Sequence, residues 1–129
     1  MYRRIQRRMS VYKIDNINTY IQFLQENNKE IEALYKELLI GVTSFFRDAA
    51  VWEELEKNII PSLLTDLRHG HILRAWVPAC STGEEAYSLA IVFKEVLAEV
   101  CPQMNITLQI FATDLDANAI DRARKGLSE

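Results

Sequence analysis

The sequence changes character at residues 71–88, which read His71-Ile-Leu-Arg-Ala-Trp-Val-Pro-Ala-Cys-Ser-Thr-Gly-Glu-Glu-Ala-Tyr-Ser88. The first eight of these residues are nearly continuous apolar residues bounded by turn formers, which predicts a buried parallel strand. Small residues at 79–83 predict a loop that lets the backbone approach a ligand closely. Residues 86–100 place apolar side chains at helical spacing until Pro102 stops the helix.

The pattern continues on both sides of this segment. Downstream, residues 106–113 predict a second strand, and Asp116 is expected to cap a helix over 117–125 that ends at Gly126. Upstream, the first half of the chain reads as helices.

The first of these upstream helices is capped by Asn16 or Asn18, and the next starts near Asn28 and ends at Gly41. A further helix carries Val51 to Ile59, and Pro61 either breaks it or starts a short helix up to Arg68.

Helices followed by strand, helix, strand and helix predict an α/β fold: a helical subdomain followed by the beginning of a doubly wound parallel sheet. We expect a helical N-terminal subdomain over 1–48, linking helices over 49–70 and the strand-helix unit over 71–129. Two strands alone make a poor core with open edges. The chain is therefore expected to be truncated relative to its functional domain, and the open edges favour self-association.

Charge and composition exclude several classes of protein. Residues 1–14 carry a charge of +5 and the rest of the chain −8, an asymmetry that indicates a cationic N-terminal face and not a nucleic-acid-binding domain. No apolar run approaches the roughly 18 residues that cross a bilayer, so no membrane insertion and a cytoplasmic location are expected. Cys80 and Cys101 lack neighbours at metal-ligand spacing, and neither a disulfide nor a metal site is predicted.

The loop after the first predicted strand is a candidate ligand site, because ligands of open α/β sheets bind at the carboxyl ends of the strands. It lacks the Gly-x-Gly-x-x-Gly fingerprint and the lysine of a phosphate-binding loop. Glu84 and Glu85 repel phosphate and suit a cationic or hydroxyl-rich ligand such as a sulfonium nucleoside. The alternative is capping, since Ser81-x-x-Glu84 and Thr82-x-x-Glu85 both match a capping box.

Two further segments carry candidate site residues. Asp114 lies at the tip of the second predicted strand, where an acid accepts hydrogen bonds from both hydroxyls of an adenosine ribose, although turn formation explains it equally. Thr43 and Arg47 flank two phenylalanines and would supply donors if residues 38–48 closed over a site. The alternative is a helix junction with two core phenylalanines and a surface arginine.

Three segments together resemble CheR-type enzymes, which methylate glutamates on chemotaxis receptors: Leu38-Leu-Ile-Gly-Val-Thr-Ser-Phe-Phe-Arg-Asp48, Cys80-Ser-Thr-Gly-Glu-Glu-Ala-Tyr-Ser88 and Phe111-Ala-Thr-Asp-Leu-Asp116. The resemblance covers about the N-terminal half of the family's catalytic unit and implies a Rossmann-like methyltransferase sheet. The first segment is also similar to versions in large multidomain bacterial signalling proteins.

The resemblance implies S-adenosylmethionine as cofactor and S-adenosylhomocysteine as product. It implies Arg47 as the catalytic residue, and the following residues at the cofactor site: Thr43, Arg47, Ala79, Ser81, Glu84, Glu85 and Asp114, with Glu85 favoured over Glu84. It also implies that the helix carrying Arg3, Arg4, Arg7 and Arg8 faces an acidic methyl-accepting receptor; a solvated face is the alternative. The chain departs from the family's pattern at Gly41, Ala79 and Ala86, where many relatives have Asn, Gly and Pro.

Such a reaction needs no general base, because a glutamate with a pKa of about 4.3 is ionised at pH 7. The residues present are expected to be inactive without the rest of the catalytic unit. Two alternatives remain. One is a non-catalytic signalling or docking module with a residual nucleotide-binding fold, and the other is a response domain that uses Asp114 as a phosphoacceptor.

Overall fold

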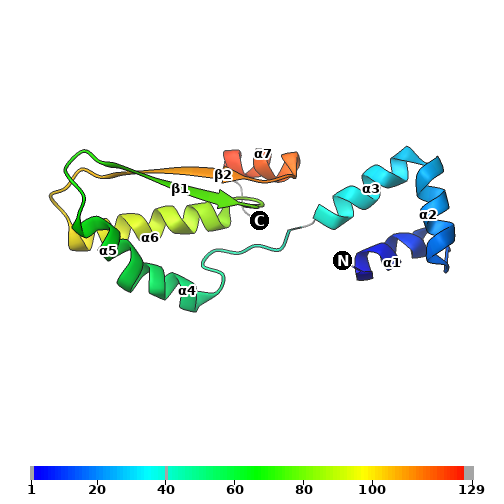
Figure 1. Cartoon of the computed structure of the whole chain (residues 1–129), viewed down its shortest axis with the longest axis horizontal. Coiled ribbons are helices and arrows are strands. Elements are labelled where there is room, and N and C mark those ends of the chain that lie inside the picture. Colours follow the sequence, from blue (N-terminus) through cyan, green and yellow to red (C-terminus); the bar gives the residue numbers. More distant parts are fainter. Residues whose placement is uncertain (1, 40, 127–129) are drawn as a thin grey trace. The chain divides into compact units, whose positions relative to one another are not determined.

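The computed structural model describes residues 2–39 and 41–126, which divide into two compact units between Gly41 and Val42 (Figure 1). From the sequence we predict this limit at residue 48. The difference arises because residues 42–48 hydrogen-bond to the second unit: the Phe46 N–H donates to Ser88 Oγ, and the Trp52 indole donates to the Arg47 carbonyl. None of the helices formed by the described residues has the length and apolar character needed to span a bilayer.

The described residues of the first unit form α1 (Tyr2–Val11), α2 (Ile17–Glu26) and α3 (Asn28–Leu39). Of the two predicted caps for α2, Asn16 is the one used, since its side chain accepts from the backbone N–H groups of Asn18 and Thr19. The predicted end of α3 at Gly41 involves Ile40, which lies outside the described residues.

A continuous helical segment opens the second unit: α4 (Ala49–Glu54), a π-helical turn η1 (Leu55–Ile59) and α5 (Ile60–Thr65). Pro61 starts a new turn and does not break the helix. In the wide turn the Ile60 N–H bonds to the carbonyl of Leu55, five residues back, and Pro61 then enters the first turn of α5, where its missing N–H costs little. The helix ends at Thr65, three residues before the predicted limit.

The predicted strand-helix-strand-helix order follows: β1 (Ile72–Pro78), α6 (Glu84–Val100), β2 (Thr107–Thr113) and α7 (Ala117–Lys125). Within the described residues these strands form a two-stranded parallel sheet, paired from Ile72 with Thr107 to Pro78 with Thr113. The carboxyl ends of both strands therefore lie at one edge, where the loops that begin at Ala79 and Asp114 meet.

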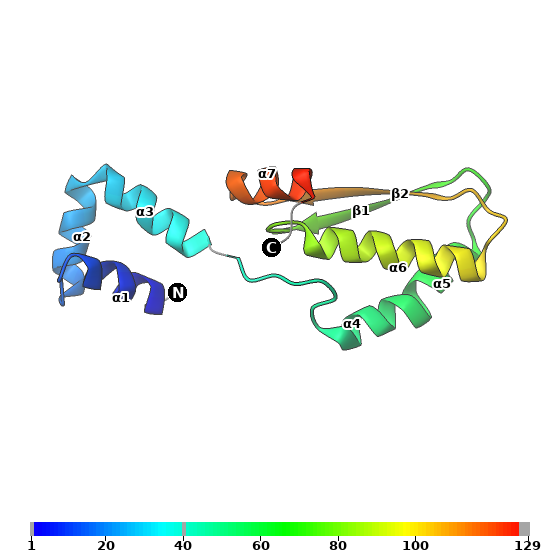
Figure 2. The ribbon, with the colours of Figure 1, turned by 180° about the vertical axis from the view of Figure 1, so that it is seen from behind.

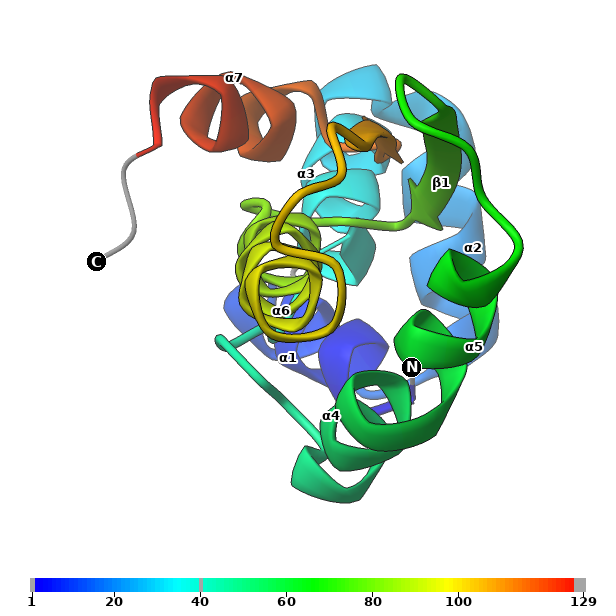
Figure 3. The ribbon, with the colours of Figure 1, turned by 90° about the vertical axis from the view of Figure 1, so that its left-hand side faces the viewer.

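One face of this sheet is covered, as Figures 1 and 2 show for α6, which runs alongside the strands. Figure 3 looks along α6 and shows it beside β1. The buried core joins α5, α6 and the residue before β2, and consists of Ile60, Leu64, Val92, Phe93, Val96 and Ile106. Burial of such side chains stabilises by roughly 1.5–3 kcal/mol each, so the core holds α6 against α5 and the residue before β2.

Candidate functional site

The loop after β1 returns sharply toward the sheet. Ala79 and Ser81 both have positive φ, 54° and 49°, a conformation that L residues adopt at a cost. The Cys80 N–H donates to the carbonyl of Thr113 at 3.0 Å, and the Ser81 N–H donates to Asp114 Oδ2 at 2.8 Å. The small-residue loop and the acidic strand tip, which the sequence treats as two separate signals, are thus directly joined.

Asp114 accepts a hydrogen bond on each carboxylate oxygen. Oδ2 accepts from Ser81, and Oδ1 accepts from the N–H of Asp116 at 2.8 Å. Asp116 itself is the N-cap of α7, since its side chain accepts from the Asn118 N–H, and Gly126 ends that helix with a φ of 67°. The predicted caps of α7 are confirmed, and the bond from the Asp116 N–H is the turn that the alternative interpretation of Asp114 predicts.

Glu84 and Glu85 lie next to each other in the first turn of α6 but in different environments. Gly83, with a φ of 98°, is the N-cap, so neither Ser81 nor Thr82 occupies that position and the two predicted capping boxes do not form. Instead the Thr82 hydroxyl lies 2.6 and 2.8 Å from the two carboxylate oxygens of Glu84, which is buried. Glu85 is exposed. Both acids lie inside the helix, which begins two residues earlier than predicted.

A small hollow of about 180 Å³ lies between α6 and α7 behind this loop, and Cys80, Gly83 and Tyr87 contribute to its lining. The Tyr87 hydroxyl donates to the carbonyl of Ala123 at 2.7 Å and ties α7 to α6. Burial, with a smaller contribution from the nearby Asp114 carboxylate, raises the pKa of the Cys80 thiol. This thiol is therefore protonated and acts as a small core side chain.

Residues 42–48 form an irregular segment and not the helix junction considered above. Arg47 donates from its guanidinium to the carbonyl of Val42 at 2.6 Å, and Thr43 is half-buried. Phe45 and Phe46 remain 43% and 40% exposed, so neither is a core residue. The Phe46 ring packs edge-on against the Trp52 ring, with 5.8 Å between the ring centroids.

A hydrogen bond of 3.0 Å from the Phe46 N–H to Ser88 Oγ places residues 42–48 against the first turns of α6. The sequence motifs do not predict a role for Ser88. The signal that points to it is a serine on the buried face of a strongly apolar helix.

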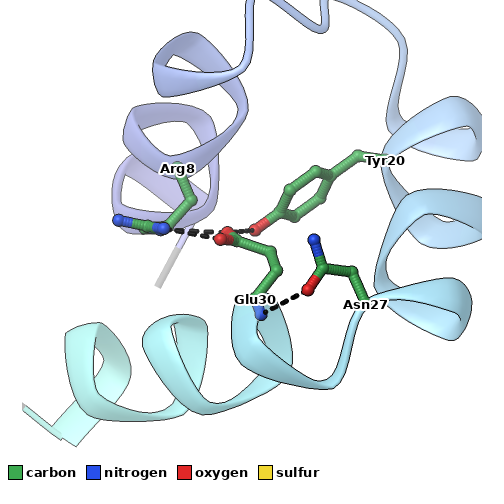
Figure 4. A network of polar contacts seen from close by, with 4 residues as sticks. All are labelled: Arg8, Tyr20, Asn27 and Glu30. Carbon is green, nitrogen blue, oxygen red and sulfur yellow. Dashed lines mark hydrogen bonds and ion pairs between the residues drawn. The ribbon is translucent and has the colours of Figure 1, made fainter.

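The arginines of α1 have separate roles within the first unit. Arg8 turns inward: its Nε and Nη2 lie 3.0 and 2.5 Å from the two carboxylate oxygens of Glu30, which also accepts from the Tyr20 hydroxyl at 2.7 Å (Figure 4). The Arg8 hydrogen bonds lower the pKa of Glu30, against the effect of burial, and burial raises the pKa of Tyr20 to about 12.

The other three arginines lie closer to the surface. Arg4 donates to the carbonyls of Glu37 and Leu38, the last turn of α3, at 3.1 and 2.9 Å. Arg7 pairs with the Glu37 carboxylate at 3.3 Å while its side chain stays 76% exposed, and Arg3 is also exposed. Of the four predicted receptor-facing residues, three thus contact α3 within their own unit, and of these Arg7 does so from an exposed position.

Two family models match consecutive parts of the chain. Residues 1–39 match the all-alpha domain of CheR methyltransferase, and residues 41–129 match its SAM binding domain. The boundary between these ranges, at residue 40, lies close to the boundary between the two structural units, which follows Gly41.

Relatives cover nearly the whole chain. A chemotaxis protein methyltransferase of Salmonella typhimurium is 31% identical over 98% of the chain and 41% of the relative. A chemotaxis protein methyltransferase of Listeria innocua is 34% identical over 95% of the chain and 44% of the relative. An "Uncharacterized 104.1 kDa protein" of Rhodobacter capsulatus is 40% identical over 96% of the chain and 13% of the relative. The chain thus spans less than half the length of each of these relatives.

The order of elements, the joined loops at the carboxyl edge of the sheet and the two matched domains agree with one another. The methyl donor of the matched domain is S-adenosylmethionine. The chain belongs to the CheR family of S-adenosylmethionine-dependent methyltransferases and carries residues of both the all-alpha and the cofactor-binding domain.

Proposed function

We propose that the protein containing these residues transfers the methyl group of S-adenosylmethionine to glutamate carboxylates of a cytoplasmic chemoreceptor domain. The observation that carries the proposal is the 2.8 Å hydrogen bond between the Ser81 N–H and Asp114 Oδ2. It brings the small-residue loop and the acidic strand tip together at the carboxyl edge of the sheet, where ligands of this class of fold bind.

The groups at this edge suit the cofactor's chemistry. A carboxylate oxygen has two lone pairs. Asp114 therefore accepts from the Ser81 N–H on one oxygen and from the Asp116 N–H on the other, and keeps capacity to accept from ribose hydroxyls. The exposed Glu85 is the favoured second acid, because Glu84 is buried and bonded to Thr82. Both acids attract a cation, and the loop that carries Ala79 and Ser81 is bonded to Asp114 through the Ser81 N–H. In this proposal Thr43 and Arg47 orient the cofactor tail or the acceptor glutamate.

The proposed methyl transfer needs no general acid or base. S-adenosylmethionine supplies a methyl group activated by a sulfonium charge. The acceptor glutamate, with a pKa of about 4.3, is already ionised at pH 7. Because opposite charges cancel during transfer, the site needs to align the two reactants, exclude water and hold fixed dipoles around them.

In this proposal the exposed arginines of α1 contact the receptor. Arg3 and Arg7 present cationic side chains, whereas Arg4 and Arg8 hold the helix that carries them. Electrostatic attraction to an acidic receptor helix accelerates encounter and weakens with salt.

The described chain is proposed to be inactive without the remaining parts of the methyltransferase domain. By itself it is expected to self-associate through the open edges of β1 and β2, and a monomeric sedimentation profile at high concentration would contradict this.

The test is tritium transfer from labelled S-adenosylmethionine to purified chemoreceptor by the complete protein. Label that is released as volatile methanol in mild alkali identifies a carboxyl ester, which distinguishes glutamate methylation from methylation of nitrogen. Glutamate-to-glutamine receptor variants serve as the control and should accept no label at the changed positions. Tight binding of S-adenosylhomocysteine without any transfer would instead favour the non-catalytic signalling module.

A further inference from the structure

Ser88 is a fully buried polar residue that the proposed function leaves without a role. Its exposed fraction is 0%, and it lies on the face of α6 that packs into the unit. Its hydroxyl donates to the carbonyl of Glu84 at 2.7 Å, one turn earlier, and accepts from the Phe46 N–H at 3.0 Å. Ser88 therefore connects two segments that are 42 residues apart in sequence.

A serine in a helix commonly donates to the carbonyl four residues earlier, and this bond alone connects no other segment of the chain. Thr65 shows it in α5, where its hydroxyl donates to the Pro61 carbonyl, and Ser62 makes a similar bond to Ile59. Ser88 differs from these two residues because it makes a second hydrogen bond. Its buried hydroxyl oxygen also accepts from the backbone N–H of Phe46, which belongs to another segment.

The segment that bonds to Ser88, residues 42–48, is curled, and its backbone is strained at two residues. Phe46 and Asp48 have φ of 51° and 61°, a region that costs non-glycine residues free energy. Arg47 closes the curl by bonding to the Val42 carbonyl, and Trp52 holds the Arg47 carbonyl at 2.7 Å. These bonds set the shape of the curl, whereas the bond to Ser88 sets its place relative to α6.

We infer that Ser88 is a positioning residue for cofactor binding. It holds the segment carrying Thr43 and Arg47 against the turn of α6 that carries Glu84 and Glu85, so that both parts of the site keep one relative placement. This inference rests on the proposed function and adds to it a residue that touches neither cofactor nor substrate.

The test compares three variants of the complete methyltransferase. Ser88→Ala removes the acceptor, and Ser88→Cys nearly retains the volume but offers a weak acceptor. Ser62→Ala is the matched control, because it removes a local helical hydroxyl bond without a link to residues 42–48. S-adenosylhomocysteine affinity is measured by calorimetry, KM and kcat by methyl transfer, and exchange of the Phe46 amide by hydrogen exchange.

Both Ser88 variants are expected to weaken S-adenosylhomocysteine binding about tenfold, the effect of one lost buried hydrogen bond. They raise the KM for S-adenosylmethionine about as much, change kcat less than about twofold, and accelerate exchange at Phe46. Ser62→Ala should leave all four values unchanged.

Wild-type affinity in both Ser88 variants, or protection of the Phe46 amide that survives the substitutions, would overturn the inference. A loss of kcat and thermal stability with unchanged KM would also overturn it, since that result describes a core residue only. Failure of the wild-type protein to bind S-adenosylhomocysteine is a distinct result, and it would remove the proposed function together with this inference.

Discussion

The carboxylate of Glu30 is an ionised group in a fully buried side chain, with Arg8 and Tyr20 as its partners. Removing water from a charge costs several kcal/mol, and a partner with good geometry offsets that cost. Because the pKa of Glu30 in the folded chain lies below its ordinary value, the pair stabilises above a pH of about 4.3. That contribution is lost as the pH falls through the folded pKa.

Arg8→Met is expected to lower the free energy of unfolding by about 3–5 kcal/mol at pH 7, because it leaves the Glu30 charge buried and unpaired. The sign of the pH dependence should also reverse: burial then raises the pKa of Glu30, and acidification stabilises the variant. Urea unfolding between pH 3 and about 7 measures both effects. Arg7→Met is the control, since the exposed Arg7–Glu37 pair is worth less than about 1 kcal/mol. Equal losses in the two variants would contradict this account.

Ala79 holds a conformation that glycine adopts more readily. Its φ of 54° is in the left-handed region, and the residue is exposed. Ala79→Gly should therefore stabilise the chain by about 1 kcal/mol. Ala75→Gly in the extended backbone of β1 makes the same chemical change and should destabilise by about 0.5–1 kcal/mol. Denaturation midpoints compare the two, and a loss of stability in both variants would show that the left-handed turn is not strained.

Gly83, the N-cap of α6, lies close to Ala123 of α7. A Cβ at this position would lie 3.0 Å from the Cβ of Ala123 and 3.1 Å from the Tyr87 ring, whereas a Cβ at Gly70 meets nothing within 4 Å. Both glycines have positive φ, 98° and 80°.

Gly83→Ala should therefore destabilise the chain more than Gly70→Ala does. Each substitution incurs the backbone cost of about 1 kcal/mol, and Gly83→Ala adds an overpacking cost of about 1–3 kcal/mol. Thermal unfolding of the two variants gives the difference directly. Equal destabilisation would mean that α7 moves freely away from α6, contrary to the Tyr87 hydrogen bond.

For the whole molecule, local signals predicted the order of elements and several of their limits. Asp116 and Gly126 were identified as the ends of α7 because capping depends on residues close in sequence. The capping boxes were wrong because Gly83 adopts a left-handed N-cap conformation that spacing does not reveal. The contacts of Arg8 with Glu30 and of Phe46 with Ser88 span 22 and 42 residues, and no local pattern specifies them.

In the candidate site, too, local sequence predicts the separate parts but not the contact between them. The sequence separately indicated the loop around Ser81 and the acid at Asp114, since each follows a strand. Their direct hydrogen bond depends on the parallel register and on the left-handed turn at Ser81, which are properties of the folded chain.

In the proposed function an adenosyl group binds between the loop at 79–83 and Asp114, and calorimetric titration of S-adenosylhomocysteine into the complete methyltransferase tests this placement. Asp114→Asn keeps the side-chain shape and one oxygen to accept from the Ser81 N–H, but it removes the charge, half of the acceptor capacity and the acceptor for the Asp116 N–H. Affinity is expected to fall at least about tenfold in this variant, while Asp116→Asn, at the N-cap of α7, should bind as the wild type does. Wild-type affinity in Asp114→Asn would contradict the claim.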